Sequence, residues 1–222
     1  MKKKPVIAID GYSSTGKSSI SKIVAQRLGL LHLDTGALYR GITLYGLQQH
    51  LANGELDILA LTENLAQIHL KLTKIGDGLH LYLNGRDVSR EIREPRISAW
   101  VSLVAKEPAI RSFLLGLQRE IAEGGGVILD GRDIGTVVLP DADYKFFMTA
   151  SIPERTRRRY LELQAGGADV TLEEVQQNLL LRDKLDSERN TAPLIKAPDA
   201  IEIDNTGLTR EETAELIISH LV

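Results

Sequence analysis

A glycine-rich loop near the start of the chain constrains the fold more than any other feature. Residues 11–18 read Gly-Tyr-Ser-Ser-Thr-Gly-Lys-Ser, the complete G-x-x-x-x-G-K-[ST] pattern. The apolar run at 6–9 predicts a buried strand before it, and a helical apolar face follows it: Ile20, Ile23, Val24 and Leu28. In this context the loop amides and the helix N-terminus face anionic oxygens, Lys17 reaches the β- and γ-phosphates, and the Ser18 hydroxyl holds Mg²⁺. The sequence therefore predicts a nucleoside triphosphate site.

Bulk properties exclude several other classes. The formal charge of −3 over 222 residues does not suit duplex binding, which depends on neutralising phosphates. Cysteine is absent, which excludes disulfides and Cys-ligated metals. No apolar run approaches the roughly 20 residues of a membrane span, and Asp10 interrupts the apolar stretch after Lys2–Lys4 too early for a signal peptide. We expect a cytoplasmic protein that binds neither nucleic acid nor membranes.

Strand and helix signals alternate along most of the chain. Five apolar segments separated by helical stretches predict an α/β fold with a parallel sheet: Val6–Ile9, Leu30–Leu33, Val127–Leu129, Tyr144–Met148 and Ile201–Ile203. Capping boxes are expected at three helix starts, with the pairs Ser151 and Glu154, Thr171 and Glu174, and Thr209 and Glu212.

Residues 69–88 differ from this pattern. Their leucines alternate with polar residues, and turn signals stand at Gly76-Asp77-Gly78 and at Asn84-Gly85. This is typical of a small antiparallel meander with one covered face. We therefore expect residues 41–100 to form an inserted subdomain.

Two polar clusters follow predicted strands of the main sheet. In the first, Asp34 has the chemistry to hold Mg²⁺-bound water or an acceptor group, Thr35 to cap the following helix, and Arg40 to bind a phosphate bidentately. In the second, Asp130-Gly131-Arg132-Asp133, the first carboxylate stands where phosphate-loop proteins support the metal, and Arg132 offers a fork of donors. Ligands of open α/β sheets bind at this edge. A plain helix entry and a charged turn remain the structural alternatives.

Arginines gather in the last third of the chain. Arg155, Arg158 and Arg159 share a helical face in the run Arg-Thr-Arg-Arg-Arg, and they are candidates for a lid that neutralises a triphosphate and excludes water. A solvated face, with Glu162 paired to Arg158 or Arg159, is the alternative. Further on, Arg182, Asp186 and Arg189 recur on one helical face.

These clusters, taken together and in order, resemble the nucleoside monophosphate kinases, and the match narrows to the bacterial cytidylate kinases over nearly the whole chain. The specific segments are Leu-Asp-Thr-Gly-Ala-Leu-Tyr-Arg at 33–40, Asp-Gly-Arg-Asp-Ile-Gly-Thr at 130–136, and the polar residues of 182–189. The resemblance implies a three-layer P-loop kinase fold with a five-stranded parallel sheet. Its core would be residues 1–40 and 101–222, with a helical lid at about 155–190, and residues 41–100 would be a small antiparallel-sheet subdomain that binds the monophosphate.

The resemblance also implies a role for each matching residue. ATP would be held by Gly11, Tyr12, Ser13, Ser14, Thr15, Gly16, Lys17, Ser18 and Ser19, with Mg²⁺ at Ser18 through the phosphates. CMP or dCMP would be bound by Thr35, Tyr39, Arg40, Ser102, Arg111, Asp130, Gly131, Arg132, Asp133, Arg182, Asp186 and Arg189. Of these, Arg40, Arg132 and Arg189 match the arginines for the acceptor phosphate, Ser102, Arg111 and Asp133 the base-reading positions, and Arg182 and Asp186 the contacts to the sugar. Lys17, Arg132, Arg158 and Arg189 would be catalytic, and Arg157–Arg159 match the lid.

Chemistry supports the base assignment, since a carboxylate such as Asp133 accepts from the amine of cytosine but not from the carbonyl of uracil. The chain departs from the commonest family pattern at Tyr12, where proline is usual, and at Thr35, where serine is usual. The expected reaction makes ADP and CDP or dCDP from ATP and CMP or dCMP, in a monomer. A UMP-, shikimate- or gluconate-type kinase is the nearest alternative, and an ATP-gated module acting on nucleic acid or protein is a more distant one.

Overall fold

The computed structural model describes residues 4–76 and 78–221 of the chain. Asp77, in the first predicted turn of the meander, and Lys2 and Lys3 lie outside the described residues. The chain forms two compact units, one of Met1–His32 with Gly125–Val222 and the other of Leu33–Gly124. We call them unit 1 and unit 2. The predicted insertion at 41–100 falls within the range of unit 2.

Unit 1 is built on a five-stranded sheet whose order is β10-β9-β1-β8-β2. Its strands are β1 (Val6–Gly11), β2 (Leu31–Asp34, which begins in unit 1), β8 (Val127–Asp130), β9 (Tyr144–Thr149) and β10 (Ile201–Asp204). The registers of β1 with β8, of β1 with β9 and of β10 with β9 are parallel. All five strands overlap the predicted apolar segments, so the predicted α/β class with a parallel sheet is confirmed.

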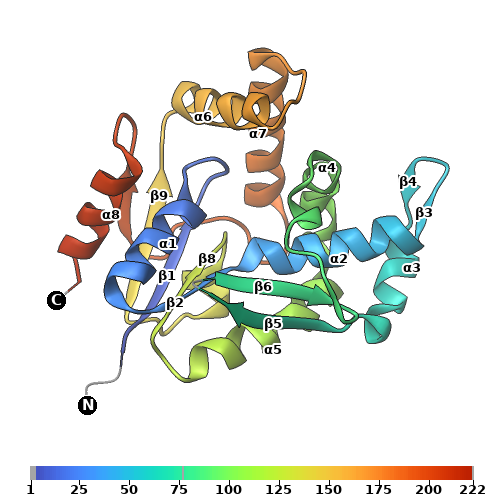
Figure 1. The fold of residues 1–222 in the computed structure, drawn as a ribbon, viewed down its shortest axis with the longest axis horizontal. Coiled ribbons are helices and arrows are strands. Elements are labelled where there is room, and N and C mark those ends of the chain that lie inside the picture. The colour runs from blue at the N-terminus through green and yellow to red at the C-terminus, as the bar shows by residue number, and fades with distance from the viewer. Residues whose placement is uncertain (1–3, 77, 222) are drawn as a thin grey trace. The chain divides into compact units, whose positions relative to one another are not determined.

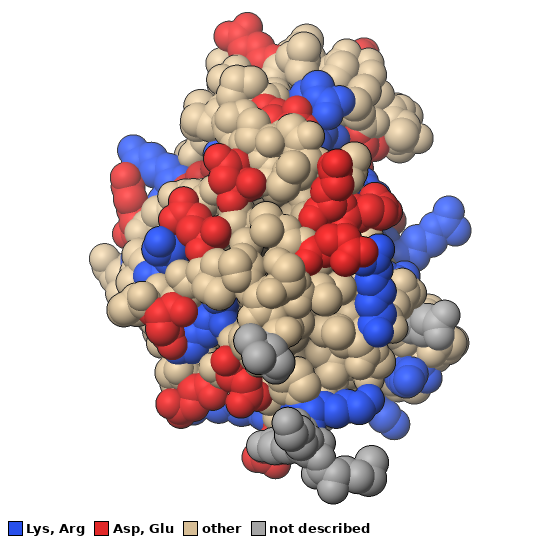
Figure 2. All heavy atoms as spheres, turned by 90° about the vertical axis from the view of Figure 1, so that its left-hand side faces the viewer, with Lys and Arg blue, Asp and Glu red and all other residues tan. Residues whose placement is uncertain are grey.

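Helices α1 (Lys17–Leu28) and α8 (Arg210–Ser219) lie side by side and pack on this sheet, as Figure 1 shows. The apolar face predicted for α1 is buried against the sheet and α8. Its residues Ile20 and Val24 belong to one core with Ile7, Ile9, Phe146 and Ile217. Helix α1 ends at Gly29, which adopts the left-handed conformation that glycine favours at a helix C-terminus. Acidic and basic side chains are interspersed on the face drawn in Figure 2.

Helices α6 (Ile152–Ala165) and α7 (Leu172–Glu188) of unit 1 pack against each other (Figure 1). The capping boxes predicted for α7, at Thr171 and Glu174, and for α8, at Thr209 and Glu212, are both present.

The capping box predicted at Ser151 is wrong, because Ser151 makes no side-chain cap hydrogen bond. Its backbone N–H donates instead to Thr206 Oγ1 at 2.8 Å. Glu154 is held by two cations, since Arg157 and then Arg158 hydrogen-bond to it and hold the pKa of its carboxyl below the usual value. Tertiary partners therefore replace the local cap.

Unit 2 is organised around α2 (Thr35–Gln49), whose buried residues include Leu38, Ile42 and Leu44. The N-cap of α2 is Asp34 and Thr35 is the first helical residue, so the predicted cap at Thr35 is wrong. The remaining elements are β3 (Leu51–Ala52), β4 (Glu55–Leu56), α3 (Ile58–Glu63), η1 (Leu65–Gln67), β5 (Leu70–Ile75), β6 (Gly78–Leu83), β7 (Arg86–Asp87), η2 (Glu91–Arg93), α4 (Pro95–Val104) and α5 (Pro108–Glu123).

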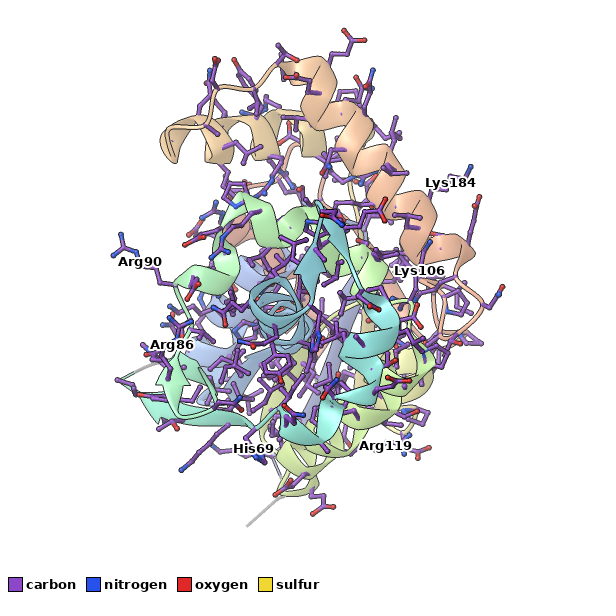
Figure 3. All side chains as sticks on the ribbon, turned by 90° about the vertical axis from the view of Figure 1, so that its right-hand side faces the viewer. His69, Arg86, Arg90, Lys106, Arg119 and Lys184 are labelled. Carbon is purple, nitrogen blue, oxygen red and sulfur yellow. The ribbon has the colours of Figure 1, made fainter. Side chains whose placement is uncertain are left out.

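The predicted meander is confirmed as the antiparallel sheet β5-β6-β7. Its leucines face α2, and Gly41 of α2 permits the close approach: a β-carbon there would lie 2.9 Å from Leu81 Cδ2. Figure 3 shows Arg86 of β7, and Arg90 beyond it, pointing outward from this unit. No helix in the described part of the chain is long and apolar enough to cross a bilayer.

Candidate active site

The phosphate loop connects β1 to α1 through strained backbone that glycine tolerates. Gly11 has φ +144°, and a β-carbon at this position would stand 2.1 Å from the Met148 carbonyl oxygen on β9. Gly16, with φ +86°, is the N-cap of α1 and accepts from Ile20 N–H at 3.0 Å. Only glycine adopts such angles readily at this spacing. The glycines of the pattern therefore set the shape of the loop.

Lys17 is turned into the loop rather than toward solvent. Its ammonium donates to the Tyr12 carbonyl oxygen at 2.5 Å and to Thr15 Oγ1 at 3.4 Å, and the residue is 5% exposed. Burial, and after it the charge of Arg132, lowers the pKa of Lys17 well below its usual value. Nearby anionic oxygens would favour its charged form.

Ser18, at the start of α1, meets the end of β8. Its hydroxyl donates to Asp130 Oδ2 at 2.6 Å, and Asp130 is 2% exposed. Hydroxyl and carboxylate oxygens suit Mg²⁺, which usually keeps several ligands from phosphates and water. The described residues contain no group of three or more His, Cys, Asp or Glu side chains placed to hold a metal. The Ser18–Asp130 pair thus fits a magnesium ion that arrives with a nucleotide, and does not fit a permanent protein-only metal centre.

Ser13 joins the loop to three other segments of unit 1. Its backbone N–H donates to Asp183 Oδ1 at 3.1 Å, and its carbonyl oxygen accepts from Arg155 Nη1 at 3.2 Å. Its hydroxyl accepts from Arg132 Nη2 at 3.0 Å. Arg155 also forms a buried ion pair with Asp183 and lies over the Tyr12 ring, 5.2 Å from its centroid. The loop is therefore joined to α6, to α7 and to the segment after β8.

The second cluster is stabilised by ion pairs. Arg132 donates through Nε to Asp186 at 2.8 Å, and Arg189 lies 3.3 Å from Asp133. Burial alone would lower the pKa of Arg132, but Asp186 and then Asp183 raise it above its usual value. These four predicted residues, which come from two distant segments, are thus brought together. Arg182 lies on α7, one turn before Asp186.

Arg158 is held by oxygens of the protein. It donates to the Asn205 carbonyl oxygen at 2.9 Å, to Asn205 Oδ1 at 3.1 Å and to Leu208 O at 3.2 Å, besides its pairing with Glu154. Asn205 in turn donates to the Thr15 carbonyl oxygen at 2.8 Å. Arg159 pairs with Glu162 at 2.8 Å, as one of the structural alternatives predicts.

Unit 2 contains the other predicted acceptor residues. Arg40 pairs with Asp34 at 2.6 Å, and the Arg111 guanidinium lies over the Tyr39 ring at 5.3 Å while Nη1 donates to the Ala105 carbonyl oxygen at 3.1 Å. Thr35, on α2, and Ser102, on α4, are both buried. Tyr39 and Arg111, far apart in sequence, are therefore in contact.

Sequence reasoning missed Asp10, His32 and Asn205. Asp10 accepts from the backbone N–H groups of Ile134 and Gly135, at 2.8 and 2.7 Å, which hold the π-helical turn η3 (Ile134–Val138). Burial raises the pKa of Asp10 to about 6, despite these two hydrogen bonds. Asp10 lies near the carboxyl end of β1, and Asn205 directly follows β10. Polar residues at the carboxyl ends of the predicted strands would therefore have identified both.

A complete phosphate loop at the carboxyl edge of a parallel sheet, with a serine–carboxylate pair and clustered arginines, defines a P-loop kinase. The sequence profile of the cytidylate kinase family matches residues 7–222. The chain therefore belongs to the cytidylate kinase family, whose members are ATP-dependent nucleoside monophosphate kinases.

Individual relatives agree with this assignment. The chain is 48% identical over 218 residues to the cytidylate kinase of Bacillus pumilus, covering 98% of this chain and 96% of the relative. It is 48% identical over 211 residues to that of Caldanaerobacter subterraneus subsp. tengcongensis, covering 95% and 92%. A crystal structure of an uncharacterized protein from Eubacterium ventriosum shares the fold, with a TM-score of 0.53 at 14% identity over 99% of this chain and 98% of that one.

Proposed function

We propose that this enzyme transfers the γ-phosphoryl group of ATP to CMP or dCMP, giving ADP and CDP or dCDP. The observation that carries the proposal is the contact between Arg132 and Ser13 at 3.0 Å. It brings an arginine assigned to the acceptor phosphate against the loop assigned to ATP. Two anionic substrates bound on either side of this contact would meet phosphate to phosphate.

In this proposal the loop Gly11–Ser19 binds the ATP phosphates through its amides, and Lys17 exchanges its present carbonyl partner for phosphate oxygens. Ser18, supported by Asp130, would hold Mg²⁺, which supplies charge neutralisation to the phosphates when it is bound. Phosphoryl transfer asks mainly for alignment and charge stabilisation. A monophosphate oxygen is already anionic near neutral pH, so no general base is required.

The acceptor residues are those that the resemblance to cytidylate kinases implies. Arg40, Arg132 and Arg189 would fix the monophosphate, and each is now paired with a carboxylate: Asp34, Asp186 and Asp133. Thr35 and Tyr39 would lie along the nucleotide, and Arg182 and Asp186 would bind the sugar hydroxyls. A buried Asp133 favours a base that offers an amine donor, together with Ser102 and Arg111.

We propose that α6 and α7 form the lid that is expected at about 155–190. Because Arg158 is engaged by carbonyl oxygens, reaching a phosphate would require it to release Asn205 and Leu208. We therefore propose that Arg158 acts first by supporting Thr15 of the loop through Asn205. Its role as a catalytic lid arginine would follow such a release.

An acceptor panel tests the proposal. Purified chain with Mg²⁺ and ATP is assayed for ADP formation with CMP, dCMP, UMP, AMP, shikimate, gluconate or no acceptor. Turnover with CMP and dCMP well above the rest is expected. Preference for UMP, shikimate or gluconate would favour those kinases, and acceptor-independent ADP formation would favour an ATP-gated module. Gel filtration and cell fractionation test the expected cytoplasmic monomer.

A further inference from the structure

The carboxylate of Asp130 is held from two sides. Ser18 donates to its Oδ2, and His32 Nε2 lies 2.6 Å from its Oδ1. His32 stands on β2, which neighbours β8 at the edge of the sheet. A carboxylate oxygen accepts, so this contact is a hydrogen bond in the tautomer that has the proton on Nε2 of His32. Both oxygens of Asp130 therefore have a donor, one from α1 and one from β2.

The His32–Asp130 contact is largely buried, so water cannot easily replace either partner. The Asp130 side chain is 3% exposed and that of His32 is 17% exposed. Without His32, Asp130 Oδ1 would lose a nearly buried donor, and one constraint on the orientation of the carboxylate would be removed. The alignment of Asp130 Oδ2 with the Ser18 hydroxyl would then be weakened.

We infer that His32 is a positioning residue for the magnesium-nucleotide site: it orients Asp130 so that Oδ2 faces the Ser18 hydroxyl. The inference rests on the proposed function only in that Ser18 and Asp130 serve Mg²⁺ bound with ATP. Groups that orient metal-site carboxylates in this way typically contribute about 10- to 100-fold in metal affinity. His32 itself touches neither the metal nor the nucleotide.

A pair of affinities tests this role. The affinity of each variant for ADP is measured by calorimetry with excess Mg²⁺ and again with EDTA. The affinity in Mg²⁺ divided by the affinity in EDTA is the Mg²⁺-dependent ratio, which is compared between variants. In His32→Leu we expect the Mg²⁺-dependent ratio to fall about 10-fold or more, with the affinity in EDTA within about twofold of wild type. His32→Gln, whose amide nitrogen extends about as far as Nε2, should restore most of the ratio, whereas the shorter His32→Asn should not.

The matched control is His80→Leu, which removes the other His–Asp pair of the described chain, His80 with Asp87 at 2.8 Å in the meander, and should leave the ratio unchanged. An unchanged ratio in folded His32→Leu would overturn the inference. So would a parallel loss of both affinities, which indicates a merely structural role, or equal defects in the Gln and Leu variants. If His32→Leu does not fold, the Gln and Asn variants decide.

The proposed function fails separately. A wild-type chain that binds ADP with a Mg²⁺-dependent ratio but phosphorylates no pyrimidine monophosphate overturns the acceptor assignment. It leaves the role of His32 to be decided by the ratio alone.

Discussion

The backbone N–H of Ser13 donates to the carboxylate of Asp183 at 3.1 Å, so the phosphate loop is bonded to a helix that lies 170 residues further along the chain. The same carboxylate pairs with Arg155 of α6. A single acidic side chain thus holds together the loop and both helices of the predicted lid. A change at Asp183 therefore affects stability and nucleotide binding together.

Asp183→Ala should lower the free energy of unfolding by about 3–5 kcal/mol, because it leaves the buried Arg155 guanidinium without its ion partner. Urea denaturation measures the change. The neighbouring Lys184→Ala is the control, since Lys184 points away from α7 (Figure 3) and its side chain is 66% exposed. Its effect should stay within about 0.5 kcal/mol. Equal unfolding midpoints for the two variants would contradict this account of the junction.

Lys17→Ala should reduce kcat by at least about 100-fold, as expected for removal of a charge-stabilising donor. The loop should still form, because its shape depends on Gly11 and Gly16, so the circular dichroism spectrum should stay native. Lys22→Ala, on the exposed face of the same helix, should turn over normally. Normal turnover of the Lys17 variant would refute the assignment of the loop to ATP.

Arg132→Lys should raise the KM for CMP by about tenfold while the KM for ATP changes little. Lysine keeps the positive charge but cannot donate to Asp186 and to a phosphate through a rigid fork. Steady-state kinetics with each substrate varied in turn measure the two KM values. Arg27→Lys, at the surface pair of Arg27 with Glu215 away from the predicted site residues, is the control. A larger change in the KM for ATP than in that for CMP would move Arg132 to the donor site.

Asp133→Asn should lower the preference for CMP over UMP by about 10- to 100-fold in kcat/KM, because an amide is able to donate to the uracil carbonyl that a carboxylate leaves unpaired. Asp133 also pairs with Arg189, so both activities are expected to fall in absolute terms. The ratio of the two, measured in one assay, separates base selection from that general loss. A constant ratio would exclude Asp133 from base reading.

The buried carboxyl of Asp10 should give a recognisable pH dependence. Burial raises its pKa from 3.8 to about 6 in the folded chain. The folded state thus binds this proton more tightly, and the resulting stabilisation is fully present below about pH 4 and is lost as pH rises through about 6. Relative to Asp10→Asn, the unfolding free energy of wild type should fall by up to about 3 kcal/mol between about pH 4 and pH 7. Denaturant titrations at several pH values measure this difference, and parallel curves would contradict it.

Local sequence signals were sufficient for most of the fold. The apolar run at 6–9 became β1, and the alternation at 69–88 became the meander. The expected cap at Ser151 failed because Thr206, distant in sequence, takes the backbone N–H that the cap would use. Short-range patterns predict which element forms but not which distant group competes for its ends.

The candidate site shows the same division. Residues at strand ends, such as Asp130 and Arg132, are identified by the rule that parallel strands share a carboxyl edge. The pairing of Arg132 with Asp186 and the convergence of three partners on Ser13 depend on how α7 returns to the loop, and spacing along the chain carries no information on that path. The local sequence does not distinguish His32 from any single polar residue in an apolar strand, because its partner Asp130 lies 98 residues further along the chain.

The anchoring of Thr15 by Asn205 has a consequence for synthesis. The glycine-rich segment is translated well before the amide that secures its carbonyl, because the two residues are 190 positions apart. A nascent polypeptide that has not yet reached residue 205 lacks this clamp. Its capacity to retain a nucleotide should therefore mature only after residue 205 has been added.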